Sequence, residues 1–123
     1  MEGSDPMSDY ELRDRTKKFA LRVIRLCSAM PNSDSARVLG KQLLRSGTSV
    51  AANYREASRG RTDAELLTKL GIVEQELDES LLWMELIVES GMLPTSIVSE
   101  LQTECDELLR MTVASIKTLK SRR

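Results

Sequence analysis

The feature that most constrains the fold is a repeat of apolar residues every three to four positions along four long segments. In each segment these residues fall on one face of a helix with 3.6 residues per turn. The segments are separated by short polar, glycine- or proline-containing breaks near residues 31–34, 60–61 and 91–94. No segment alternates apolar and polar residues as a half-exposed β-strand would. The sequence therefore predicts an all-α protein with four helices.

Two of the helix starts are marked by pairs of capping residues. Ser8 with Glu11, and Thr62 with Glu65, have the spacing of a capping box, in which each side chain binds the other residue's backbone N–H. These pairs predict the starts of the first and third helices. The second helix is predicted to run from about residue 35 to residue 59, after a polar turn.

Proline and glycine predict where the helices end. Pro31 stops the first helix, Gly60 the second and Gly91 the third, because proline cannot continue a helix and glycine favours its C-terminal end. The fourth helix is predicted to begin with Thr95 or Ser96 as its N-cap.

Short connections between consecutive helices require antiparallel neighbours. We therefore expect an antiparallel up-down-up-down four-helix bundle over residues 8–120. Residues 1–7 are polar and aperiodic, which predicts a disordered leader or a remnant added for expression, and residues 121–123 form a basic tail. The residues expected to face the core are Leu12, Phe19, Val23, Leu26, Cys27, Met30, Leu39, Leu43, Val50, Tyr54, Ala57, Leu66, Leu70, Val73, Leu77, Leu81, Met84, Val88, Ile97, Leu101, Cys105, Leu108, Thr112, Ile116 and Leu119.

Composition argues against several classes of function. The chain of 123 residues has the size of one domain and contains no histidine, the commonest general base and metal ligand. Cys27 and Cys105 are far apart and lie at apolar positions, as expected of buried thiols in a reducing cytoplasm. The sequence has no phosphate-binding glycine motif, signal peptide or apolar run of membrane length. We therefore expect a cytoplasmic protein with no enzymatic activity, metal, cofactor, small-molecule substrate or membrane contact.

The segment Gln42–Ala57 within the second predicted helix has an unusual arrangement of polar residues. Beside its apolar face runs a polar stripe, which consists of Gln42, Ser46, Ser49, Asn53 and Glu56. The side away from the core is basic, and its residues are Arg37, Lys41, Arg45, Arg55 and Arg59, continued by Arg61. An ordinary surface helix mixes charges of both signs. This helix therefore predicts a binding or assembly surface.

Charge is distributed unevenly along the chain although its net charge is only −1. Residues 35–61 carry six basic residues and one acidic residue, whereas residues 62–90 carry eight acidic residues and one lysine. The basic face has three possible roles: it can track a phosphate backbone, remain solvated, or pair with the acidic helix of the same or a neighbouring subunit. Aromatic residues make up only 3% of the chain, which argues against base stacking on single strands.

Glutamates at helical spacing raise two alternatives to a structural role. Glu76 and Glu79 lie three residues apart, and Glu56 can face them from the preceding helix. Di-metal sites in four-helix bundles normally include a Glu-x-x-His motif, which this chain lacks, and a catalytic carboxylate pair is a further alternative. We favour a polar seam in which these carboxylates bind Lys69, Arg45, Asn53 or backbone groups.

The third predicted helix is more apolar than one core requires. Trp83 falls off the centre of its inward stripe, so it is either a core-edge residue or an aromatic anchor in a subunit interface. Other apolar residues that fall outside the stripe are Ile72, Leu82, Leu86 and Ile87. A second apolar face of this kind predicts oligomerisation.

Four stretches of the chain resemble those of a known family. They are QLLRSGTSVAANYREA over residues 42–57 with KLGI over residues 69–72, ELDESLLWMEL over residues 76–86, and ECDELLR over residues 104–110. The chain resembles, from about residue 19 to residue 120, the four-helix bundle proteins encoded in intervening sequences of bacterial 23S rRNA genes. A related group is the accessory variability protein of diversity-generating retroelements. The resemblance implies a homopentameric ring or barrel, a role with RNA or a nucleoprotein, and no established enzymatic activity.

Two functional hypotheses follow. The first is a non-enzymatic homo-oligomer, a pentamer by resemblance, whose basic faces bind RNA, DNA or a nucleic-acid enzyme such as a reverse transcriptase. In this hypothesis the polar stripe, Glu76, Glu79 and Trp83 build the assembly. The alternative is a pure assembly or protein-partner module, in which the basic helix of one subunit lies against the acidic helix of another.

Overall fold

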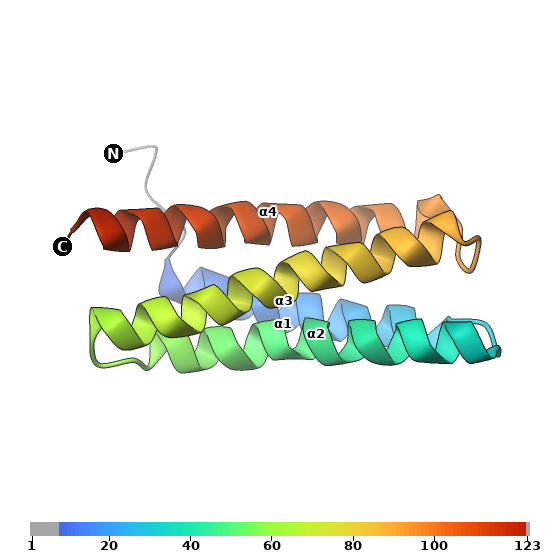
Figure 1. The fold of residues 1–123 in the computed structure, drawn as a ribbon, viewed down its shortest axis with the longest axis horizontal. Coiled ribbons are helices and arrows are strands. Elements are labelled where there is room, and N and C mark those ends of the chain that lie inside the picture. The colour runs from blue at the N-terminus through green and yellow to red at the C-terminus, as the bar shows by residue number, and fades with distance from the viewer. Residues whose placement is uncertain (1–7, 123) are drawn as a thin grey trace.

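The computed structural model describes residues 8–122, so the predictions for residues 1–7 and for Arg123 lie outside the described residues. Four helices make up the fold: α1 (Asp9–Ser28), α2 (Asp34–Ser58), α3 (Asp63–Glu89) and α4 (Thr95–Ser121). Consecutive helices run antiparallel along one common direction, and no strand occurs between residues 8 and 122 (Figure 1). The predicted all-α four-helix bundle is confirmed.

Of the two predicted capping boxes, one forms completely. At the start of α1, Ser8 Oγ accepts a hydrogen bond from the Glu11 backbone N–H at 3.1 Å, and Glu11 Oε1 accepts one from the Ser8 N–H at 3.0 Å. At the start of α3, Thr62 Oγ1 accepts from the Glu65 N–H at 3.1 Å. The carboxylate of Glu65, however, accepts from the N–H of Arg61, one residue before the N-cap. The second box is therefore only half formed.

The start of α4 differs from the prediction. The helix begins at Thr95 itself, and its N-cap is Pro94, which has an extended backbone conformation and no side-chain capping bond. The prediction of Thr95 or Ser96 as the N-cap is wrong because the fixed φ angle of proline already sets the chain to enter the helix, and the Pro94 carbonyl accepts from the Ile97 N–H. Gly91 ends α3 as predicted, with a positive φ angle of 79° that favours glycine.

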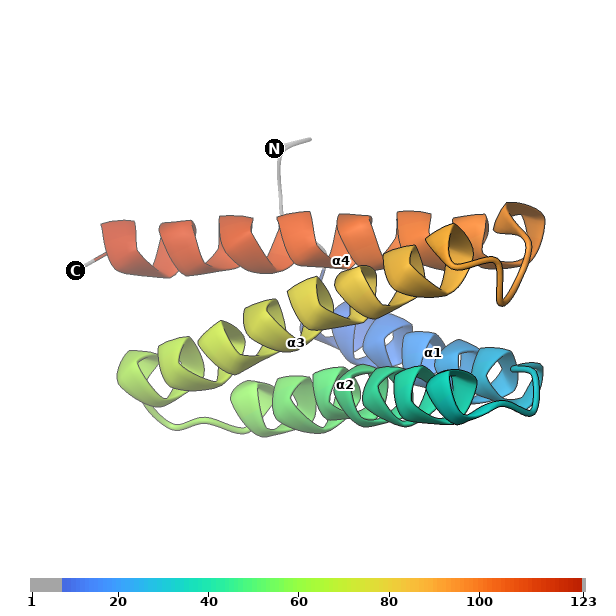
Figure 2. The ribbon, with the colours of Figure 1, turned by 45° about the vertical axis from the view of Figure 1, so that its right-hand side comes forward.

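The helices are arranged so that each packs against its neighbours in the chain, and α1 also touches α4. The contact between α1 and α4 is the least extensive of the four, and α1 and α3 lie diagonally opposite each other without direct contact of their backbones. In Figures 1 and 2, α3 runs obliquely, from the side of α4 at one end of the bundle to the side of α2 at the other. The bundle is therefore splayed at the end where α4 finishes.

The core follows the predicted stripes with two corrections. Ile97 is 53% exposed, and its neighbour Val98 is fully buried in its place. Ile87, which we expected outside the inward stripe, is also fully buried. Both differences arise because the buried residues of α3 and α4 recur in steps of three and four, at a period close to 3.5, so the inward direction shifts along each helix. Leu82 and Leu86 are 45% and 40% exposed, as expected of a second apolar face.

Candidate nucleic-acid and assembly surfaces

The basic residues of α2 divide into paired and unpaired groups. Arg37 is held by Asp34 and by the side-chain oxygen of Asn32 at the first turn of its own helix. Arg45 reaches across to α3, where its guanidinium lies 3.3 Å from Glu76 Oε2 and 2.9 Å from Glu79 Oε1. The remaining members of the predicted basic face form no ion pair with any residue between 8 and 122. These unpaired members are Lys41, Arg55, Arg59 and Arg61.

Electrostatics favour the Arg45 pairing. The two carboxylates on α3 raise the pKa of the Arg45 guanidinium above its ordinary value, chiefly through the hydrogen bond to Glu79. A second bridge, from Lys69 Nζ to Glu56 Oε1 at 2.5 Å, joins α3 to α2 closer to the connecting loop. The predicted polar seam between the two helices therefore forms within one protomer. Arg45 and Glu56 are therefore occupied by contacts within the protomer, whereas Lys41 and Arg55 on α2 form no ion pair with a described residue.

Ser46 lies deeper than the sequence suggested. We expected it at the edge of the core, but it is fully buried, and its Oγ lies 2.7 Å from the Oγ of Ser80 on α3, which is also fully buried. Ser46 Oγ also donates to the carbonyl of Leu43. Hydroxyls can be buried at low cost when they bind each other and a backbone carbonyl. Ser46 is therefore part of the packing between α2 and α3.

The other members of the polar stripe are closer to the surface than Ser46, since Glu56 is exposed and the remaining three are half-buried. Asn53 donates from its side-chain nitrogen to the carbonyl of Ser49 on the preceding turn. Gln42 and Ser49 are half-buried beside the core.

Trp83 on α3 is half-buried and packs against the core, and its indole N–H is buried without a hydrogen-bond partner among the described residues. Trp83 is therefore a core-edge residue in the protomer, and a role in a subunit interface stays a prediction.

The carboxylates considered for catalysis are held in ion pairs. Glu76 and Glu79 share Arg45, and Glu56 binds Lys69. Within residues 8–122, no group of three or more histidine, cysteine or acidic side chains is arranged to hold a metal ion. The expectation that the protein is not an enzyme stays a prediction. No helix in the described part of the chain is long and apolar enough to cross a membrane.

Both thiols are poorly suited to react. Cys105 is fully buried and its Sγ lies 3.2 Å from the carbonyl of Leu77, while Cys27 Sγ lies 3.3 Å from the carbonyl of Gly40. Burial raises the pKa of Cys27 to about 11 and that of Cys105 to about 12. The thiolate is the reactive form, so both residues act as small packing groups.

Two polar contacts were not foreseen from the sequence. Arg15 on α1 binds both oxygens of Glu104 on α4, at 2.9 and 2.5 Å, and also binds Glu107 at 3.0 Å. Tyr54 donates its hydroxyl to Asp9 at 3.0 Å, and this bond joins α2 to the start of α1. The Glu-x-x-Glu spacing of Glu104 and Glu107 was the available signal for a basic partner.

A cavity opens at the splayed end of the bundle. Its volume is about 670 Å³, and all four helices contribute to it. Apolar side chains make up much of its wall, among them Leu12, Leu70, Met111 and Leu119. It forms because α1 has 20 residues and α4 has 27, so α1 does not cover the last turns of α4.

Comparison with known proteins identifies a family and a solved structure that the chain resembles. The family model described as 23S rRNA-intervening sequence protein matches residues 8–114. The crystal structure of a protein of unknown function from the S23 ribosomal protein family of Bacteroides thetaiotaomicron has 31% sequence identity to this chain and a TM-score of 0.83. The match covers 90% of this chain and 99% of that one. Among curated proteins, none matches the chain.

Proposed function

The chain belongs to the family of 23S rRNA-intervening sequence proteins, and we propose that it is a non-enzymatic, homo-oligomeric scaffold that binds structured RNA through α2. We further propose that the oligomer is a pentamer and that it acts in the cytoplasm. The names of the family and of the similar Bacteroides protein, which refer to ribosomal RNA and to a ribosomal protein, support RNA as the partner.

The observation that carries the proposal is the unpaired part of the basic face on α2. Arg55 comes 14 residues after Lys41, and Arg59 comes 4 residues after Arg55, so these three side chains lie on one side of the helix. Arg61 follows just after the helix. At about 1.5 Å per residue, Lys41 and Arg59 are separated by about 27 Å along the helix axis. Four cations without acidic partners among residues 8–122 fit a chain of phosphates, because phosphate contacts release counterions from the nucleic acid.

Oligomerisation strengthens the argument. One protomer has a net charge of −1 and only a short basic face, so we expect its own affinity for RNA to be low. A ring places several copies of the face on one particle, and sites that bind the same RNA together gain effective concentration. The proposal therefore requires assembly as well as charge.

RNA binding can be tested by fluorescence anisotropy with a structured RNA at a low and a moderate salt concentration. The test variant is Arg55→Glu/Arg59→Glu. The matched control is Lys18→Glu/Arg110→Glu, which makes the same change in charge at residues that pair with acids on their own helices. We expect the test variant to lose about tenfold or more in affinity and to show a smaller salt dependence, by about one unit of slope per lost phosphate contact.

The RNA proposal is wrong if the unmodified protein does not bind at low salt, or if the control variant loses as much affinity as the test variant. A second candidate, an assembly or protein-partner module without RNA, is favoured by the exposed Leu82 and Leu86 on acidic α3. It predicts that Arg55→Glu changes the mass measured by light scattering while no RNA binds under any condition.

A further inference from the structure

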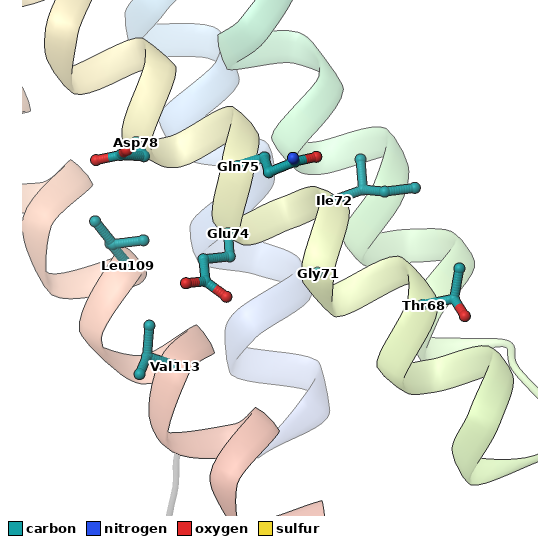
Figure 3. A pocket seen from close by; sticks show the side chains of 8 residues that line it. All are labelled: Thr68, Gly71, Ile72, Glu74, Gln75, Asp78, Leu109 and Val113. Atoms are coloured by element: carbon teal, nitrogen blue, oxygen red, sulfur yellow. The ribbon is translucent and has the colours of Figure 1, made fainter.

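A groove between α3 and α4 carries negative charge and has no partner within the protomer. Its volume is about 610 Å³. Figure 3 shows Glu74 and Asp78 extending from α3 towards the side of Leu109 and Val113 on α4. Gly71 also lines the groove, and a side chain added there would meet no atom within 4 Å. The groove therefore has an apolar wall on α4, an open stretch of α3 backbone and an acidic edge.

The charge of the groove determines which partners it can accept. No lysine or arginine lines it, and neither Glu74 nor Asp78 forms an ion pair with any residue in the range 8–122. Phosphate groups would be repelled here, so the groove is not a continuation of the proposed RNA surface. A suitable occupant is a basic helix face with exposed apolar residues, because it would bury the α4 wall and neutralise the acidic edge.

The outward side of α1 has these properties. Leu21 and Ile24 are 42% and 43% exposed, although a helix of a monomeric bundle normally shows polar residues on this side. Lys17 and Arg25 lie beside them, four residues on either side of Leu21, and neither forms an ion pair with a described residue. These four residues define the α1 face, which is about 12 Å long at 1.5 Å per residue.

The two surfaces cannot meet within one protomer, since α1 and α3 are diagonally opposite in the bundle. We propose that the α1 face of one copy docks into the α3/α4 groove of the next copy, with Lys17 and Arg25 near Glu74 and Asp78. This inference rests on the homo-oligomer of the proposed function and names the surfaces that build it. The contact joins two different surfaces, and repeated contacts of this kind close into a ring when the rotation allows. It also leaves the basic face of α2 accessible.

Charge exchange between the two surfaces tests the proposal. The groove variant is Glu74→Lys/Asp78→Lys, the α1 variant is Lys17→Glu/Arg25→Glu, and a third chain combines both changes. Because like charges then face each other, we expect the first two variants to dissociate at protein concentrations about tenfold or more above that of the unmodified protein. The combined chain restores opposite charges, so it should recover association to within about threefold. Light scattering over a dilution series measures all three.

The matched control is Glu85→Lys/Glu89→Lys, which changes two exposed acids one turn apart on the same helix but outside the groove. It should associate like the unmodified protein. Circular dichroism checks that each variant is folded, and Glu74→Gln/Asp78→Asn replaces the groove variant if charge reversal unfolds it. The proposal is overturned if the groove variant keeps its association, or if the combined chain is folded but stays dissociated.

Failure of this inference can be told apart from failure of the proposed function. If the unmodified protein is an oligomer and the groove variant is unaffected, only the placement of the interface is wrong, and another surface carries the assembly. If the unmodified protein is a monomer at every concentration, the oligomeric scaffold itself is wrong. The RNA titration is a separate measurement, and it tests the basic face of α2 whichever interface is used.

Discussion

At the scale of single residues, Gly47 lies at a close contact between α2 and α1. A β-carbon at this position would lie 2.8 Å from both methyl groups of Val23, which is fully buried. We therefore predict that Gly47→Ala destabilises the protein by about 1–3 kcal/mol, the usual cost of overpacking a core. The free energy of unfolding in urea, measured at one protein concentration, checks this.

Gly40 supplies the control for that substitution on the same helix. A β-carbon there would lie 3.7 Å from Met30 Cγ, an ordinary contact distance. Gly40→Ala should stabilise the protein by up to about 1 kcal/mol, because alanine favours the helix more than glycine does. If Gly47→Ala were as stable as Gly40→Ala, α1 and α2 could not be in close contact at Val23.

The two cysteines give a prediction about reactivity. Burial raises the pKa of Cys27 to about 11, so its thiol stays protonated at pH 8 and the thiolate is a very small fraction. The same holds for Cys105, whose pKa is raised to about 12. We expect both thiols to react slowly with a disulfide reagent at pH 8 in the folded protein, and both to react rapidly in guanidinium. Rapid reaction of Cys105 in the folded protein would contradict its buried position, and rapid reaction of Cys27 would contradict its raised pKa.

At the scale of the helices, Arg15 is the main polar connection between α1 and α4. Its side chain and that of Glu104 are 22% and 19% exposed, and their double contact joins the two neighbouring helices that pack least extensively against each other. Hydrogen bonds to charged groups contribute more than neutral ones, particularly when both partners are shielded from water. We predict that Arg15→Ala lowers the free energy of unfolding by about 1–3 kcal/mol.

Arg110 is the matched control for this prediction. It forms an ion pair with Asp106 on its own helix, and its side chain is 79% exposed. Exposed pairs of this kind contribute little, so Arg110→Ala should change the free energy of unfolding by less than about 0.5 kcal/mol. Equal effects of Arg15→Ala and Arg110→Ala would mean that the contact between α1 and α4 does not depend on Arg15.

The four helices could be predicted because they depend on the local spacing of apolar residues. The pairing of Arg45 with Glu76 and Glu79 could be predicted because it joins opposite charges on adjacent helices. The Arg15 contact could not, since its partners lie 89 and 92 residues away and the choice among several acids depends on how the helices pack. Burial of Ser46 was also missed, because its partner Ser80 is polar and does not belong to an apolar stripe. The structure was therefore required for side-chain partners on non-consecutive helices, such as Arg15 and Glu104, and for a buried pair of polar residues, such as Ser46 and Ser80.

At the scale of the whole molecule, the oblique course of α3 divides the bundle into a well-packed and an open end. At the packed end, Met84, Ile87 and Val98 are fully buried. At the open end, Met111 and Ile116 are only partly buried, and the cavity of about 670 Å³ lies beside them. Because α1 covers α4 poorly there, local opening should cost less free energy at this end than in the middle of α3.

Hydrogen exchange measures this difference directly. We predict that backbone amides of residues 113–119 exchange about tenfold or more faster than those of residues 77–84, which corresponds to a difference in opening free energy of about 1.4 kcal/mol or more. Ser115→Leu, which places a larger apolar side chain in the cavity wall, should slow exchange in residues 113–119. Lys117→Leu is the control, because Lys117 is exposed and does not line the cavity. If the last turns of α4 exchange as slowly as the middle of α3, then another part of the assembly covers the open end, and the splay seen in one protomer is closed when the protein associates.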